Sequence, residues 1–230
     1  MVVVKQLINW AVDRELLSLD PLRGLKVKQA KARPQPCFTL EQVECILDAA
    51  GPYRVIFEIL AFSGMRIGEL VWLTWADVDF ENGLIRIQPK DTWVPKHGKS
   101  RLIPMHERVR AVLESLSRKH RWVFTARRSS KYPKGDHQLS DVHLLEKLKK
   151  ILRPLKIEGH LHTFRHFFIS HCANSGVPPF QLIKWVGHAD VSIVMHYYAL
   201  RDEESLWTMK KLSTQDAKQG EQPQSVPRAV

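Results

Sequence analysis

The chain has 230 residues, and its 35 Lys plus Arg against 24 Asp plus Glu give a formal net charge of +11 at pH 7. A hydrophobic content of 44%, with nine Phe and seven Trp, is enough for a folded core and excludes general disorder. The surplus positive charge indicates a polyanionic partner, and the length allows one domain, or one domain with a fragment of another.

No apolar run approaches the roughly 18 to 20 residues that a membrane-spanning helix requires, and the first ten residues lack the pattern of a signal peptide. We therefore expect a cytoplasmic protein without a membrane partner. The three cysteines, Cys37, Cys45 and Cys172, form no CxxC pair and are expected to be reduced and buried.

The N-terminal stretch differs from the rest of the chain. Apolar residues at helical spacing predict one helix over Val4 to Leu17, which cannot fold alone. A basic segment with prolines, residues 26–38, is predicted to be an extended linker. We expect a fragment of another domain over 1–25, the main domain over 39–212, and a disordered tail over 213–230.

The main domain is predicted to begin with a helix capped by Thr39, with Gln42 as the capping-box partner. A second helix follows over Tyr53 to Phe62 and stops at a Ser-Gly pair. The period then changes to two, which predicts a small antiparallel sheet. Its expected strands are 84–87, 92–94 and 101–104. Helical patterning resumes over 107–116, 140–152, 163–174, 179–186, 191–200 and 203–212, so the fold class is mainly α with a small antiparallel β-sheet (α+β).

The helix over 163–174 carries a cluster of basic side chains. Helical spacing separates its phenylalanines from His162, Arg165 and His166, which are therefore predicted to face away from the core. The plain interpretation is a solvated helix face. A zinc site is a weaker alternative, because neither a Cys pair nor a carboxylate completes a ligand shell. Its ligands would be His160, His162, His166 and His171.

Four short motifs follow one another along the chain: Arg66 after a helix break, His162-x-x-Arg165, a Gly-His pair ending at His188, and Tyr197 nine residues after His188. Together they resemble the tyrosine recombinase family, also called phage-type integrases, over about residues 39–212. Each motif alone is unspecific, but four in this order are highly specific. The resemblance implies that 1–25 is the remnant of a helical core-binding domain.

The resemblance also implies a mechanism that needs no metal, cofactor or ATP. The hydroxyl of Tyr197 attacks a DNA phosphodiester and leaves a 3'-phosphotyrosyl link and a free 5'-hydroxyl. Arg66 and Arg165 stabilise the charge of the transition state with their planar donor forks. His162 takes the tyrosine proton, because a phenol with a pKa of about 10 does not ionise spontaneously at neutral pH. His188 is expected to donate a hydrogen bond to the phosphate.

The leaving 5'-oxygen needs a proton, which the family supplies from a lysine in the β-hairpin. Alignment of the first strand puts Lys90 at this position, while Lys96 and Lys99 remain open alternatives in a long hairpin. Any of the three lysines could instead meet only backbone phosphates. Glu69, three residues after Arg66, is expected to orient that arginine by a charge-assisted hydrogen bond.

The expected partner is double-stranded DNA, and the predicted helix over 203–212 could join protomers into a homotetramer on that DNA. The leading hypothesis is a site-specific recombinase or integrase with Tyr197 as nucleophile. One alternative is a truncated DNA-binding remnant without catalysis, which would bind DNA and form no covalent adduct. The other is an enzyme like a type IB topoisomerase, which would relax supercoils without strand exchange.

Overall fold

The computed structural model describes residues 2–25, 36–90, 92–96, 98–126, 133, 137–187 and 191–198. The chain forms two compact units, Met1–Gln35 and Pro36–Val230. The first contains helix α1 (Val2–Asp13). The predicted helix to Leu17 is too long, because the chain turns at Glu15 with φ 59° and the N–H of Leu16 donates to the carbonyl of Ala11. The origin of this unit in a core-binding domain stays a prediction.

The larger unit begins as predicted with a capped helix, α2 (Leu40–Ala49). The hydroxyl of Thr39 accepts from the N–H of Gln42, and the N–H of Thr39 donates to the side-chain oxygen of Gln42. These bonds satisfy backbone donors that a helix start leaves unpaired. After a 3-10 turn, η1 (Gly51–Tyr53), the chain enters helix α3 (Arg54–Ser63).

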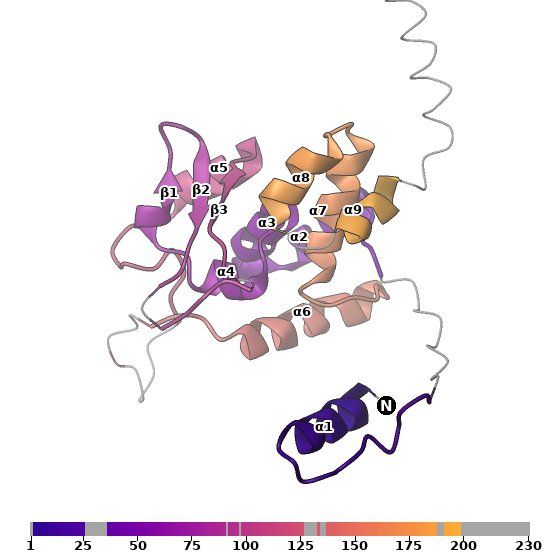
Figure 1. Cartoon of the computed structure of the whole chain (residues 1–230). Coiled ribbons are helices and arrows are strands. Elements are labelled where there is room, and N and C mark those ends of the chain that lie inside the picture. Colours follow the sequence, from indigo (N-terminus) through magenta and orange to yellow (C-terminus); the bar gives the residue numbers. More distant parts are fainter. Residues whose placement is uncertain are drawn as a thin grey trace, which may run out of the picture. The chain divides into compact units, whose positions relative to one another are not determined.

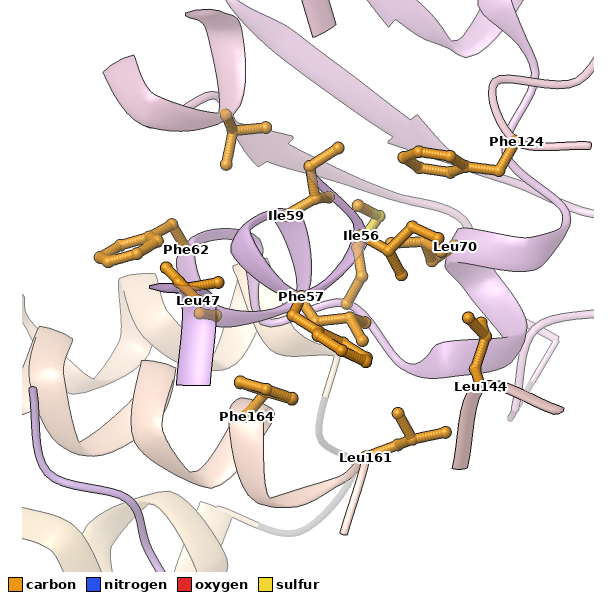
Figure 2. Packing of buried hydrophobic residues seen from close by; sticks show 14 of the residues in the cluster. Leu47, Ile56, Phe57, Ile59, Phe62, Leu70, Phe124, Leu144, Leu161 and Phe164 are labelled. Carbon is orange, nitrogen blue, oxygen red and sulfur yellow. The ribbon is translucent and has the colours of Figure 1, made fainter. Parts of the chain in front are cut away.

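Helix α3 is the centre of the core, and its residues from Ile56 to Ser63 are all buried. Figure 2 shows Phe57 pointing toward Phe164, and their ring centroids are 5.5 Å apart. The helix ends at Gly64, which has φ 63°; a Cβ there would lie 2.3 Å from a ring carbon of Phe168. Only glycine fits so close to the Phe168 ring. From this turn the chain continues into the short helix α4 (Ile67–Val71).

The sheet has three antiparallel strands in the order β1-β2-β3: β1 (Val78–Asp79), β2 (Leu84–Ile87) and β3 (Arg101–Pro104). A 3-10 turn, η2 (Trp75–Asp77), precedes it. Two of the predicted strands are thus confirmed. The prediction of a strand over 92–94 is wrong, since Trp93 pairs only with Lys90 in an isolated bridge, and β1 takes the third place in the sheet.

The remaining helices are α5 (Glu107–Ser115), α6 (Asp141–Leu155), α7 (Thr163–Asn174), α8 (Pro179–Val186) and α9 (Val191–Tyr198). Figure 1 shows the sheet at the left of the larger unit and α7 and α9 at the right, with α2 and α3 between them, while α8 packs against β3. The predicted fold class, mainly α with a small antiparallel sheet, is confirmed. No helix within the described ranges is long and apolar enough to cross a membrane. The predicted helix over 203–212 lies outside these ranges.

Two predictions about burial are wrong in part. Of the three basic residues predicted to face away from the core, His162 is exposed, but Arg165 is only 1% exposed and His166 9%, because α7 packs against α3, α8 and α9. Among the cysteines only Cys172 is buried, whereas Cys37 and Cys45 are exposed. All three thiols are free, as expected.

Candidate active site

Arg66 sits at the N-cap of α4, where the chain leaves the glycine turn after α3. Its Nη1 donates to Oε1 of Glu69 at 3.0 Å, and its backbone N–H donates to Oε2 at 2.8 Å. The contact expected between these two side chains is therefore present. The second guanidinium nitrogen of Arg66 donates to the carbonyl of Gly187 at 3.3 Å. This bond brings α4 to the end of α8, 121 residues further along the chain.

Arg101 is a second partner of Glu69, and the sequence pattern identified it only as a strand residue. Its two terminal nitrogens donate to the two oxygens of Glu69 at 2.8 and 2.6 Å. Its Nε donates to the carbonyl of Trp185 at 2.7 Å. The sequence shows Arg101 only as a cation at the start of β3. Such a cation is more often solvated than held by two hydrogen bonds to a buried carboxylate.

The carboxylate of Glu69 is almost fully buried, with 2% of the residue exposed. Burial alone would raise its pKa, but the hydrogen bonds and charge of Arg101 and the backbone N–H of Arg66 hold the pKa below its ordinary value. Glu69 is therefore ionised at neutral pH. It neutralises one charge of a group that carries several guanidiniums.

Arg165 is the most deeply buried cation of the site. Its Nη1 donates to the carbonyl of Gly64 at 2.6 Å and its Nη2 to the carbonyl of Val186. Burial, with the nearby charge of Arg66, lowers its pKa to about 9, so it stays charged at neutral pH. Its Nε is buried and has no hydrogen-bond partner among the described residues. A buried donor without a partner is costly, and an oxygen anion would satisfy it.

The end of α8 joins these arginines. Three consecutive carbonyls, those of residues 185, 186 and 187, accept hydrogen bonds from Arg101, Arg165 and Arg66 in that order. The C-terminal end of a helix carries partial negative charge and holds cations without neutralising them. Three guanidiniums and the single carboxylate of Glu69 therefore leave a positive site.

Tyr197, on α9, contacts a histidine that lies outside the four motifs. Nδ1 of His166 lies 2.5 Å from the hydroxyl oxygen of Tyr197. The ring of His162 packs edge-on against His166, with centroids 4.9 Å apart. The neighbouring Tyr198 donates its hydroxyl to the carbonyl of Val177 and packs against the core around α8.

The proton-carrying groups of the site are shifted toward their neutral forms. Burial raises the pKa of Tyr197 to about 12, and the nearby Cys37 adds to this while Arg165 opposes it. His162 is open to solvent on one side, yet the protein packed around its ring, followed by the charges of His166 and Arg165, lowers its pKa to about 4. Burial also lowers the pKa of His166. Both imidazoles are therefore neutral at pH 7.

The hairpin lysines lie in two different places. The ammonium of Lys90 is held by both oxygens of Asp77, at 2.5 and 2.6 Å, and only 10% of its side chain is exposed. Lys96 and Lys99 line a cavity of about 620 Å³ between β3 and α8, whose wall includes Arg101. His188 lies outside the described residues.

The zinc interpretation of the histidines gains no support from the described geometry. No group of three or more His, Cys, Asp or Glu that could hold a metal ion occurs within the described ranges. His171 instead stacks on Phe167, with centroids 5.3 Å apart, and meets the ring of Phe62 edge-on. His166 is turned to the tyrosine.

Comparison with known families decides the assignment. The family model of the phage integrase family matches residues 37–204, which is most of the chain. The chain belongs to the phage integrase family. The prediction of a tyrosine-type site-specific recombinase, an enzyme class that cuts and rejoins DNA, is confirmed by this match.

Curated relatives agree with this membership. The chain is 25% identical over 206 residues to tyrosine recombinase XerD of Halalkalibacterium halodurans, covering 84% of this chain and 67% of the relative. It is 27% identical over 208 residues to XerD of Ralstonia nicotianae, covering 85% and 66%. The chain thus spans about two thirds of the length of these curated relatives.

Solved structures share the fold. The integrase of the transposon Tn1549, in complex with transposon right end DNA, matches with a TM-score of 0.70 at 20% identity, covering 91% of this chain and 76% of that one. The recombinase XerH bound to its difH substrate matches with a TM-score of 0.56 at 20% identity, covering 78% and 55%. At this identity the likeness shows the fold, and both of those proteins were solved on DNA.

Proposed function

We propose that this chain cuts and rejoins double-stranded DNA at a specific site, through a 3'-phosphotyrosyl intermediate on Tyr197. The observation that carries the proposal is the convergence of Arg66 and Arg165 on adjacent carbonyls at the end of α8, with the buried Nε of Arg165 left without a partner among the described residues. A phosphodiester brings the oxygen anion that such a group binds.

In the proposed reaction the hydroxyl oxygen of Tyr197 forms a bond to phosphorus while the bond from phosphorus to the 5'-oxygen breaks. The phenolic proton leaves to a neutral imidazole, a role that the family pattern gives to His162. Arg66 and Arg165 bind the non-bridging oxygens, where charge increases in the transition state. His188 has the family role of a further donor to the phosphate. A second 5'-hydroxyl then attacks the intermediate and releases Tyr197, without a cofactor.

We further propose that the proton for the leaving 5'-oxygen comes from the hairpin, with Lys90, Lys96 and Lys99 as candidates. The contacts of Lys90 argue for a structural role, because its ammonium is already paired with a buried carboxylate. Lys96 and Lys99 line the cavity that Arg101 shares, which supports either of them over Lys90.

The nucleophile can be tested with a nicked suicide duplex, which traps the covalent intermediate because the cleaved strand diffuses away. Since the target site is unknown, the duplex carries a site selected from random DNA by binding to the full chain. We expect a covalent adduct with the native chain and with Tyr198→Phe, and none with Tyr197→Phe. An adduct that persists in Tyr197→Phe would contradict the assignment.

A second candidate function is DNA binding without catalysis, which the net charge of +11 supports without any catalytic step. Binding of the selected duplex without any adduct, even on a suicide substrate, would support it. Relaxation of supercoiled DNA without strand exchange would instead indicate activity like that of a type IB topoisomerase.

Assembly of a homotetramer through 203–212 and a location in the cytoplasm, where bacterial DNA lies, are part of the leading proposal.

A further inference from the structure

His166 occupies the position next to the proposed nucleophile. Its Nδ1 lies 2.5 Å from the hydroxyl oxygen of Tyr197, and the two rings are tilted by only 26° at a centroid distance of 6.2 Å. The residue is 9% exposed, so the contact is largely shielded from water. A hydrogen bond of this length between a phenol and an imidazole is the geometry from which a proton is transferred.

His162, the residue at the family position for proton transfer, meets this pair from the side. Its ring is perpendicular to that of His166, at 89°, with the centroids 4.9 Å apart. Its backbone N–H donates to Nδ1 of His160, which fixes the turn before α7. His162 is thus placed to set the orientation of the His166 ring.

We propose that His166 is a catalytic residue that accepts the phenolic proton of Tyr197 as the hydroxyl attacks the DNA phosphate. The inference rests on the proposed function in that it takes Tyr197 as the nucleophile. The O–H bond of Tyr197 breaks, its proton goes to Nδ1 of His166, and the oxygen forms the bond to phosphorus. The electron pair of the broken phosphorus–oxygen bond leaves with the 5'-oxygen, which takes its proton from the hairpin lysine. On rejoining, the His166 imidazolium returns the proton to the released phenolate.

The surroundings of His166 suit a base that is neutral before the reaction. Among the described residues, the titratable and charged groups beside the pair are Arg165 on the same helix, His160 and His162 before it, and Cys37 near Tyr197. Burial first, and then the charges of His160 and Arg165, lower the pKa of His166 below its ordinary value. A neutral ring with its proton on Nε2 leaves Nδ1 free to accept from the phenol.

The same surroundings favour proton transfer during the attack over transfer before it. With the pKa of Tyr197 raised to about 12 and that of His166 lowered, the phenolate and imidazolium pair is scarcely populated beforehand. The DNA phosphate stabilises the imidazolium that forms beside Arg165, because its negative charge offsets the positive charge of the ring. The transfer is therefore coupled to bound DNA.

The first test compares cleavage of the nicked suicide duplex by His166→Gln, His162→Gln and the native chain between pH 5.5 and 9. The native rate should be maintained at pH 6.5, where an ordinary imidazole is half protonated, and should fall only at lower pH, because the pKa of His166 is lowered and a protonated imidazole cannot accept. His166→Gln should cleave at least about 100-fold more slowly at pH 7, with a rate that rises tenfold per pH unit because hydroxide replaces the base. If His166 had only a structural role, His166→Gln would lower the rate but keep the pH profile of the native chain.

The matched control is His171→Gln, on the same helix, whose ring stacks on Phe167 rather than on the tyrosine. It should keep the native pH profile. If His166→Gln keeps the native profile while His162→Gln acquires the rising one, the base is His162 and the proposal is overturned. An adduct in Tyr197→Phe would instead overturn the proposed nucleophile, which is a separate outcome.

A measurement without DNA tests the proton position directly. In the full chain with ¹⁵N-labelled histidine, His166 should show an unprotonated Nδ1 and a protonated Nε2 at pH 7. Its Nδ1 resonance should shift in Tyr197→Phe, which removes the hydroxyl donor. A proton bound to Nδ1 at pH 7, or a resonance unchanged in Tyr197→Phe, would overturn the proposal even if the chain cleaves no DNA.

Discussion

Gly187 is a residue for which any side chain is too large. It has φ 63°, and a Cβ at this position would lie 2.9 Å from Cδ of Arg101. Gly187→Ala should cost about 1 to 2 kcal/mol for the left-handed backbone. It should also displace Arg101 from Glu69 and slow DNA cleavage. Urea unfolding and the suicide-duplex assay measure the two effects.

Gly51→Ala is the matched control, because Gly51 has φ 51° and no atom lies within 4 Å of the added Cβ. It should carry the backbone cost alone and leave cleavage unchanged. Equal losses of stability in the two variants, with normal cleavage by Gly187→Ala, would show that the contact with Arg101 tolerates the extra carbon.

A DNA substrate with sulfur in place of the bridging 5'-oxygen distinguishes the lysine that protonates the leaving group from the other two lysines. With a 5'-bridging phosphorothiolate the departing group is a thiol with a pKa of about 8.5, which needs no proton from the enzyme. The alanine variant of the true acid should lose at least about 100-fold on ordinary DNA and recover on the sulfur substrate. We expect this for Lys96→Ala or Lys99→Ala.

Lys90→Ala should behave differently, because it leaves the carboxylate of Asp77 buried without its cation. Removing one partner of a buried ion pair costs about 3 to 5 kcal/mol, so unfolding should occur at lower urea. Its cleavage should show no sulfur rescue. Rescue of Lys90→Ala would identify Lys90 as the proton donor, as the alignment of the first strand predicts.

The sequence predicts residues that belong to a motif. It does not predict residues that reach the site only because distant elements pack together. The resemblance of the four motifs to the family pattern predicts the roles of Arg66, Arg165 and Tyr197, and these roles stay predictions. Arg101 reaches Glu69 across 32 residues, and His166 reaches Tyr197 across 31. Neither contact leaves a periodic signal, because each depends on how β3 and α9 pack.

The boundaries of α7 and α8 could be predicted because strong turn signals flank both helices. The elements against which the two helices pack could not be predicted. Polar residues in α7 predicted a solvated face, but inside the protein Arg165 donates to a carbonyl at the end of α8 and His166 contacts the hydroxyl of Tyr197. The residues 92–94 have strand formers yet no continuous partner, and β1 has only two residues, too few for an alternating pattern.

The carboxylate of Glu69 joins α4 to β3, and this connection should depend on pH. Burial opposes ionisation, but Arg101 and Arg66 hold the folded pKa below the unfolded value of about 4.3. A group of this kind binds fewer protons when folded, so its stabilisation is complete above the unfolded pKa and is lost as pH falls through the folded pKa. Relative to Glu69→Gln, the native chain should be more stable at pH 7, and the difference should shrink below about pH 4.3.

Urea unfolding at several pH values measures this difference. Glu114→Gln is the control, since Glu114 is half exposed in its pair with Arg110 and should change stability by less than about 1 kcal/mol. A difference between the native chain and Glu69→Gln that stays constant down to pH 3.5 would show that Glu69 does not carry the pH dependence.

For the whole molecule, the fold class of the larger unit could be predicted because helical and strand periods alternate clearly along it. The relation of the N-terminal unit to the rest could not, because a charged, proline-containing segment connects them and carries no packing pattern. The charge of this segment can nevertheless be tested by its effect on DNA binding.

Segment 26–38 contains four cations, Lys26, Lys28, Lys31 and Arg33. If they track the DNA backbone, changing all four to Ala should reduce the slope of log affinity against log salt by up to about 3.6, because each phosphate contact contributes about 0.9. Titration of a fluorescent duplex between 50 and 300 mM salt measures the slope. Exchanging Lys for Arg and Arg for Lys keeps the charge and should keep the slope. An unchanged slope in the alanine variant would show that the positive charge that contacts DNA lies elsewhere in the chain.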